Sequence, residues 1–134
     1  MLPAALPHER LRDSDTILPA LVDDLEQRGL LDSTLIYVMG EMGRSPKVNA
    51  KAGRDHWPQC GFCLMMGGGI KGGIEYGTTD AIAAYPASNP VSPADIVATI
   101  YQQLGIDSHT MLPDRTGRPL PIAHGGQPIW DIIG

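Results

Sequence analysis

Apolar side chains recur at helical spacing soon after residue 12 and predict an amphipathic helix with one core-facing stripe. The stripe consists of Ile17, Leu18, Leu21, Val22 and Leu25. The polar residues 13–16 offer N-terminal caps, and Gly29 suits the left-handed stop position. Pro19 is tolerated in the first turn, where its missing N–H costs little, so we expect the helix to begin close to it. Residues 1–12 show no clear period and are expected to form an irregular N-terminal arm.

Two short, continuous apolar runs predict strands at residues 34–39 and 61–66. Runs of this kind are typical of strands that are covered on both faces. A helix joined to a strand by a short link indicates a parallel α/β layer. The intervening residues 41–60 form a long loop, and such loops in compact domains are usually functional or disordered.

The second predicted helix begins at Ser92-Pro93-Ala94-Asp95, which has the pattern of a capping box with proline at the first helical position. Its expected buried stripe consists of Ile96, Val97, Ile100, Tyr101 and Leu104. Gly105 is expected to end this helix. Residues 114–121 are rich in turn formers, and residues 128–133 are expected either to add a short edge strand or to remain loose.

Length and composition limit the possible classes of protein. A chain of 134 residues is one domain or part of one, and 16 Gly and 12 Pro indicate long, shaped loops. The net charge of −5 and the absence of a contiguous Lys/Arg run argue against nucleic acid and anionic membranes as partners. No apolar stretch is long enough to span a bilayer, and no signal-peptide pattern is visible at the amino terminus, so the sequence leaves the compartment open.

The strongest candidates for functional residues are Glu41 and His56. Glu41 follows the first predicted strand, and ligands of open α/β sheets bind outside the carboxyl ends of the strands. Carboxylate and imidazole together suit a divalent cation such as Zn²⁺. Asp55 is a third candidate ligand, and Arg44 suits a phosphate or sulfate group because its guanidinium matches two oxygens at once. The sequence therefore predicts a metal site with an anionic substrate.

Each of these residues also has a purely structural explanation. Glu41 can cap a turn or pair with Arg44, which would then be an ordinary ion-pair partner. His56 can pack beside Trp57 with a local hydrogen bond. Asp55 can orient a ligating histidine or pair with Arg54; an orienting role is common for such neighbours.

Two further motifs carry less weight. Cys60 and Cys63 form a C-x-x-C, but Cys63 leads into a predicted strand, where residues three apart point to opposite faces, so we expect two buried thiols without redox or metal function. The glycine-rich segment 67–73 lacks the order of a phosphate-binding loop and is expected to be a strand-exit turn. A nucleotide-binding module built on this segment is the weakest of the functions considered.

Several short motifs occur in the order found in one known family. They are Gly29-Leu30-Leu31-Asp32-Ser33-Thr34-Leu35, Gly40-Glu41-Met42-Gly43-Arg44-Ser45-Pro46, Gly53-Arg54-Asp55-His56-Trp57-Pro58, Gly67-Gly68-Gly69-Ile70-Lys71-Gly72-Gly73, Pro93-Ala94-Asp95 and Asp114-Arg115-Thr116-Gly117-Arg118-Pro119-Leu120-Pro121. With them, residues 30–121 resemble the C-terminal part of the DUF1501 proteins, a sulfatase-like group related to the alkaline phosphatase superfamily.

The resemblance implies an α/β fold over residues 13–134: the C-terminal portion of a parallel-sheet sandwich of the alkaline phosphatase/sulfatase-like type. It matches Glu41 to the metal-binding carboxylate of a late strand and His56 to the ligand histidine of the next loop. The implied cofactor is a divalent metal such as Zn²⁺, Mn²⁺ or Ca²⁺. The superfamily usually has histidine directly after that carboxylate, whereas this chain has Met42.

The same resemblance places the nucleophile and an early metal-binding carboxylate upstream, outside this chain. We therefore expect a C-terminal fragment of a hydrolase of sulfate or phosphate esters with little activity alone, and either self-association or an upstream partner segment to cover its sheet. The alternative is a non-catalytic binding or structural domain that keeps the fold. Members of the family are often exported, although this chain shows no export signal.

Overall fold

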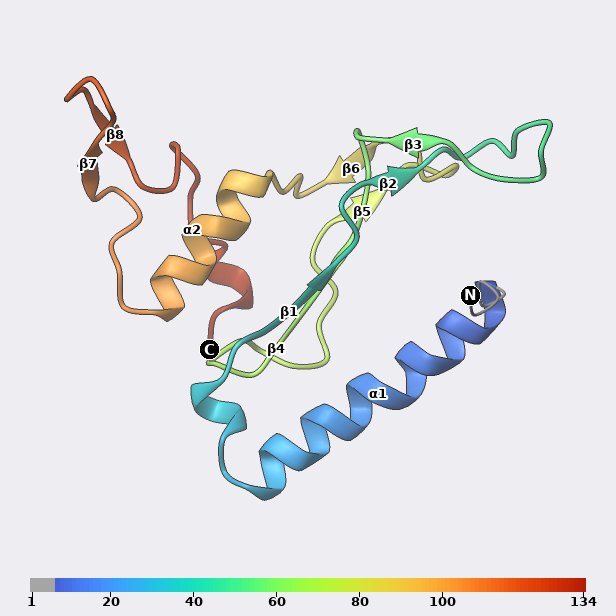
Figure 1. The fold of residues 1–134 in the computed structure, drawn as a ribbon, viewed down its shortest axis with the longest axis horizontal. Helices are drawn as coiled ribbons and strands as arrows, with labels where there is room; N and C mark the ends of the chain where they lie inside the picture. The colour runs from blue at the N-terminus through green and yellow to red at the C-terminus, as the bar shows by residue number, and fades with distance from the viewer. Residues whose placement is uncertain (1–6) are drawn as a thin grey trace.

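The computed structural model describes residues 7–134, with side chains from residue 13 onward. In this part of the chain two α-helices, two short 3-10 helices and eight short strands alternate (Figure 1). Their bounds are α1 Pro7–Gln27, η1 Leu31–Ser33, β1 Ile36–Met39, β2 Gly43–Arg44, β3 His56–Trp57, β4 Cys63–Met66, β5 Thr78–Thr79, β6 Pro86–Ser88, α2 Pro93–Gln103, β7 Met111–Pro113, β8 Pro119–Pro121 and η2 Trp130–Ile132.

The strands pair antiparallel, in four separate two-stranded ribbons, so the predicted parallel-sheet sandwich of the alkaline phosphatase/sulfatase-like type is wrong. The two apolar runs do form strands, β1 and β4, but Ile36 lies opposite Met66 and Met39 lies opposite Cys63. Parallel neighbours need a crossover connection, usually a helix. Here β2 and β3 form a hairpin between β1 and β4 (Figure 1). The hairpin reverses the direction of the chain, so β4 pairs antiparallel with β1.

Helix α1 begins at Pro7, so Pro19 lies in its interior rather than in its first turn. The predicted irregular arm is therefore helical over residues 7–12, and residues 1–6 lie outside the described part. The predicted stop at Gly29 is confirmed by its φ of +66°. The helix runs apart from the β1–β4 ribbon (Figure 1), and Ile17 and Leu21 on its apolar face are 62% and 41% exposed. No helix of the described residues is long and apolar enough to cross a bilayer.

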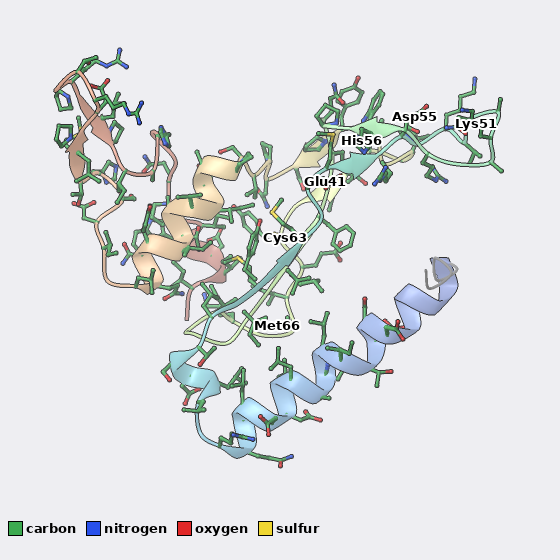
Figure 2. The ribbon with its side chains drawn as sticks, viewed as in Figure 1. Glu41, Lys51, Asp55, His56, Cys63 and Met66 are labelled. Carbon is green, nitrogen blue, oxygen red and sulfur yellow. The ribbon has the colours of Figure 1, made fainter. Side chains whose placement is uncertain are left out.

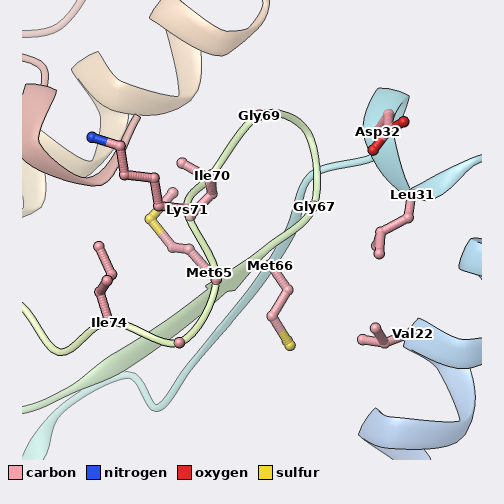
Figure 3. Close-up of a pocket in the computed structure, with 12 residues that line it drawn as sticks. Val22, Leu31, Asp32, Met65, Met66, Gly67, Gly69, Ile70, Lys71 and Ile74 are labelled. Atoms are coloured by element: carbon pink, nitrogen blue, oxygen red, sulfur yellow. The ribbon is translucent and has the colours of Figure 1, made fainter. Parts of the chain in front are cut away.

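An open pocket of about 400 Å³ lies between the C-terminal part of α1 and the end of β4. Figure 3 shows Met66 of β4 pointing toward Val22 of α1, with Leu31 of η1 beside them. Gly67 and Gly69, in the turn that follows β4, also line this pocket (Figure 3). The apolar faces of α1 and of the β1–β4 ribbon thus lie on opposite sides of an open pocket and do not pack together.

Helix α2 carries the predicted capping box, in which Ser92 accepts from the backbone N–H of Asp95, and the Asp95 carboxylate accepts from that of Ser92. Its buried residues are Ala98 and Thr99, not the predicted stripe, and Leu104 is 65% exposed. The difference arises because the C-terminal segment packs along the Thr99 side of the helix. There the backbone N–H of Ile129 donates to the Thr99 hydroxyl at 3.0 Å.

The C-terminal segment is neither a paired edge strand nor loose. It forms η2, followed by an antiparallel bridge between Ile133 and Ile70. The buried apolar residues of the described chain are few and mostly small. They are Ala84, Ala98, Ala123 and Ile132. The core therefore lies around α2, while the β1–β4 ribbon and α1 stay half-exposed.

Candidate functional site

The β2–β3 hairpin positions the candidate site residues. Gly43 lies opposite Trp57, and Arg44 lies opposite His56. A side chain at Gly43 would overlap the carbonyl of Cys60, so the tight approach of the two arms requires glycine there. Just beyond the strands the backbone N–H of Ser45 donates to the Asp55 carbonyl at 2.9 Å, which extends the pairing.

The loop that closes the hairpin is held by its own hydrogen bonds. The side-chain oxygen of Asn49 accepts from the backbone N–H groups of Lys51 and Gly53, each at 3.0 Å. The guanidinium of Arg54 donates to the carbonyl of Ser45 at 2.7 Å and also to that of Pro46. Such local bonds give a long loop a defined shape without a strand ladder.

The hairpin brings Glu41 and His56 together. Nε2 of His56 lies 3.8 Å from Oε1 of Glu41, and the two side chains are 56% and 74% exposed (Figure 2). Glu41 does not end a strand of a parallel sheet, because it lies between β1 and β2 on one arm of the long hairpin, and His56 lies on the other arm. Two atoms bound to one Zn²⁺ ion lie at most about 4.2 Å apart, since each bond is roughly 2.1 Å long. The pair therefore fits one shared divalent ion.

Asp55 does not complete a three-ligand cluster. One of its carboxylate oxygens accepts from the Asn49 amide at 2.9 Å, and its backbone N–H donates to the Ser45 hydroxyl at 3.1 Å. Arg54 is engaged with backbone carbonyls instead of with Asp55. Within the described residues no group of three or more His, Cys, Asp and Glu side chains is arranged to hold a metal ion.

Arg44 is exposed and lies beside His56 through the β2–β3 pairing. The alternative ion pair between Glu41 and Arg44 is not formed, since the partner that Glu41 meets is His56. The Arg44 guanidinium is thus available to an anion that approaches the Glu41–His56 pair.

Trp57 anchors the hairpin to the rest of the chain, a role that the sequence did not indicate. Its indole N–H donates to the carbonyl of Ala84 at 2.6 Å, and its ring meets that of Tyr85 edge-on with centroids 5.9 Å apart. A buried indole usually finds an acceptor. The acceptor, the carbonyl of Ala84, lies 27 residues further along the chain, so sequence patterns could not identify it.

The two remaining motifs of the sequence are the cysteine pair and the glycine segment. Cys60 and Cys63 are free thiols and are half-buried, not fully buried as predicted. Burial raises the pKa of Cys63, while a hydrogen bond with the Tyr37 hydroxyl lowers it to a smaller extent. Gly67 follows β4 directly with a φ of +68°, and a side chain there would overlap the carbonyl of Thr34. The glycine segment therefore begins with the predicted strand-exit turn.

Comparison with known proteins identifies one family. The family described as "Protein of unknown function (DUF1501)" matches residues 4–133. No curated protein and no solved structure matches the chain. Because the family match covers nearly the whole sequence, the chain belongs to the DUF1501 family.

Proposed function

We propose that this chain contributes the Glu41–His56 pair to a divalent-metal site in a hydrolase of sulfate or phosphate esters. The observation that carries the proposal is the 3.8 Å separation between Nε2 of His56 and Oε1 of Glu41, on two facing arms of one hairpin. Imidazole nitrogen and carboxylate oxygen are ligands that Zn²⁺ and Mn²⁺ accept. The relation of the family to sulfatases and alkaline phosphatase is part of the proposal.

The metal, when bound, would stabilise negative charge on the ester oxygens and activate the attacking group. The chain's own residues have simpler tasks. Glu41 and His56 hold the ion, Asp55 and Asn49 keep the loop in shape beside His56, and Arg44 binds the anionic group of the ester. A guanidinium suits that task because it donates two parallel hydrogen bonds to sulfate or phosphate.

Two ligands do not complete a site, so the proposal includes further polypeptide that supplies the other ligands and the nucleophile. The large exposed surface supports this. The chain exposes 10014 Å², whereas a compact protein of its mass, 14.3 kDa, exposes about 6,800 Å². The excess of roughly 3,200 Å² is about four times what one partner buries in a standard interface.

The test is metal binding by the purified chain, measured by calorimetry with Zn²⁺ and Mn²⁺. We expect an affinity in the micromolar range that falls at least tenfold in both Glu41→Ala and His56→Ala. The matched controls are Glu26→Ala and His109→Ala, which remove an exposed carboxylate and an exposed imidazole elsewhere. Equal affinity in all five proteins, or no binding by the folded chain, would refute a Glu41–His56 metal site.

The second candidate function is a non-catalytic binding or structural domain. It is favoured by the high exposure of Glu41 and His56, because an exposed ion pair is a common surface feature with little energetic weight. The same titration separates the two functions, since a surface ion pair predicts no metal affinity that depends on both residues.

A further inference from the structure

Positive charge is concentrated in the loop that carries the candidate site. Residues 44–54, the basic hairpin loop, contain four of the ten Lys and Arg residues and none of the fifteen Asp and Glu residues. The loop therefore carries +4, and the rest of the chain carries the other six cations against fifteen acids, or −9.

Three of these four cations are not used by the fold. Arg44, Lys47 and Lys51 are exposed, and within residues 13–134 their charged groups take part in no hydrogen bond or ion pair. By contrast, Arg28 pairs with Asp24 at 3.0 Å, and Arg118 pairs with Asp114 at 3.2 Å. The unpaired charges are available to a ligand.

The basic hairpin loop also presents its charges on a fixed scaffold. Arg54 and Asn49 bond to the backbone on both sides of the loop, and Ser45, buried at its base, donates its hydroxyl to the Lys47 carbonyl at 2.8 Å. A loop whose backbone is already ordered loses less conformational entropy when it binds a ligand. This distinguishes the loop from a loose charged connection.

We infer that the basic hairpin loop is a docking ridge for a linear polyanion, specifically a sulfated polysaccharide. Figure 2 shows Lys51 near the far end of the loop, with His56 and Glu41 nearer β1. A small ester held by Glu41, His56 and Arg44 leaves Lys51 without a ligand. A chain of sulfated sugars reaches both ends of the loop and presents one of its esters to the metal pair. The inference rests on the proposed function, since it names the substrate of that site.

The observations favour a polysaccharide over a nucleic acid. Residues 44–54 contain no aromatic side chain, and single-stranded nucleic acids are commonly bound through base stacking on aromatic rings. The nearby Trp57 is engaged with Ala84 and Tyr85.

The experiment measures binding of dextran sulfate to the chain, without added metal, at low and at physiological ionic strength. We expect binding that weakens steeply with salt, and an affinity about tenfold lower in Lys47→Gln/Lys51→Gln. The charge-matched control is Arg28→Gln/Arg115→Gln, which removes two exposed cations, one from the turn directly after α1 and one from the turn between β7 and β8. This control should retain most of the affinity.

The outcomes separate this inference from the proposed function. Glu41→Ala and His56→Ala should retain dextran sulfate binding, because the basic hairpin loop binds the polyanion through its cations and not through these two metal-binding residues. Retained dextran sulfate binding without metal affinity would overturn the metal site but support the ridge. Absence of dextran sulfate binding, equal loss in the control pair, or equally tight binding of a single-stranded oligonucleotide would overturn the inference, whatever the metal titration shows.

Discussion

The carboxylate of Asp95 accepts a hydrogen bond from the backbone N–H of Gln127 at 2.9 Å, and this bond joins the first turn of α2 to the C-terminal segment. Its other oxygen accepts from the backbone N–H of Ser92 at 2.9 Å and from the Ser92 hydroxyl at 2.6 Å. Donation by Gln127, and then by the Ser92 hydroxyl, holds the pKa of Asp95 below its usual value. One carboxylate thus closes the helix cap and fixes the chain end.

Acid should therefore destabilise the α2 region through Asp95. Because the folded pKa is depressed, the stabilisation is present above the unfolded pKa of about 3.9 and is lost as pH falls through the folded value. At neutral pH we expect Asp95→Asn to lower the free energy of unfolding by about 1 to 2 kcal/mol. Thermal melts at pH 7 and at pH 2.5 test this, and the gap between variant and wild type should shrink in acid. Asp32→Asn, in exposed η1, is the control.

Replacement of Gly43 should break the hairpin without removing a ligand. An added Cβ would overlap the Cys60 carbonyl, so we expect Gly43→Ala to cost about 3 kcal/mol or more and to separate Glu41 from His56. Metal affinity should fall as far as in His56→Ala. Gly72→Ala is the matched control, because nothing lies within 4 Å of a Cβ there. Unchanged metal binding in Gly43→Ala would show that the pair does not depend on the β2–β3 register.

Trp57→Phe tests the anchor between the hairpin and the segment before β6. The ring remains, but the Ala84 carbonyl loses its indole donor, and Ala84 is buried. We expect a loss of about 1 kcal/mol in the free energy of unfolding. Trp130→Phe should change it little, since Trp130 is exposed. Denaturant titration of both variants by circular dichroism makes the comparison, and equal effects would contradict an anchoring role.

Cys63 should react slowly with alkylating reagents near pH 8. Burial raises its pKa, and only the thiolate is nucleophilic. In a Cys60→Ser background we expect the rate with iodoacetamide to keep rising as the pH is raised above 8. Tyr37→Phe removes the hydrogen bond that lowers the Cys63 pKa, so it should slow the reaction further. Mass spectrometry of timed samples gives the rates.

The apolar face of α1 should act between molecules rather than within this chain. Ile17 and Leu21 are largely exposed, so Ile17→Gln/Leu21→Gln should change the free energy of unfolding by less than about 1 kcal/mol. The same change should reduce self-association or dye binding by the isolated chain, measured by sedimentation and by fluorescence of a hydrophobic probe. A large loss of stability would mean that the helix packs on its own chain.

The sequence predicted well those features that depend on near neighbours. Three such features each follow from residues within a few positions of one another. They are the capping box of Ser92 and Asp95, the strands at 36–39 and 63–66, and the left-handed Gly29. The boundaries of α1 were less accurate, because Pro19 suggested a start that the helix does not use. The buried side of α2 was also missed, since it is chosen by Ile129 and Gln127 from the far end of the chain.

The sequence by itself determined the two helices, the strands β1 and β4, and the choice of Glu41 and His56 as candidate residues, because propensity, capping and charge act locally. Only the tertiary structure decided that β1 and β4 run antiparallel, that Arg44 faces His56, and that Trp57 reaches Ala84. Those relationships depend on the direction in which the chain returns. A loop without a crossover helix reverses the chain, and that reversal, not any motif, placed His56 beside Glu41.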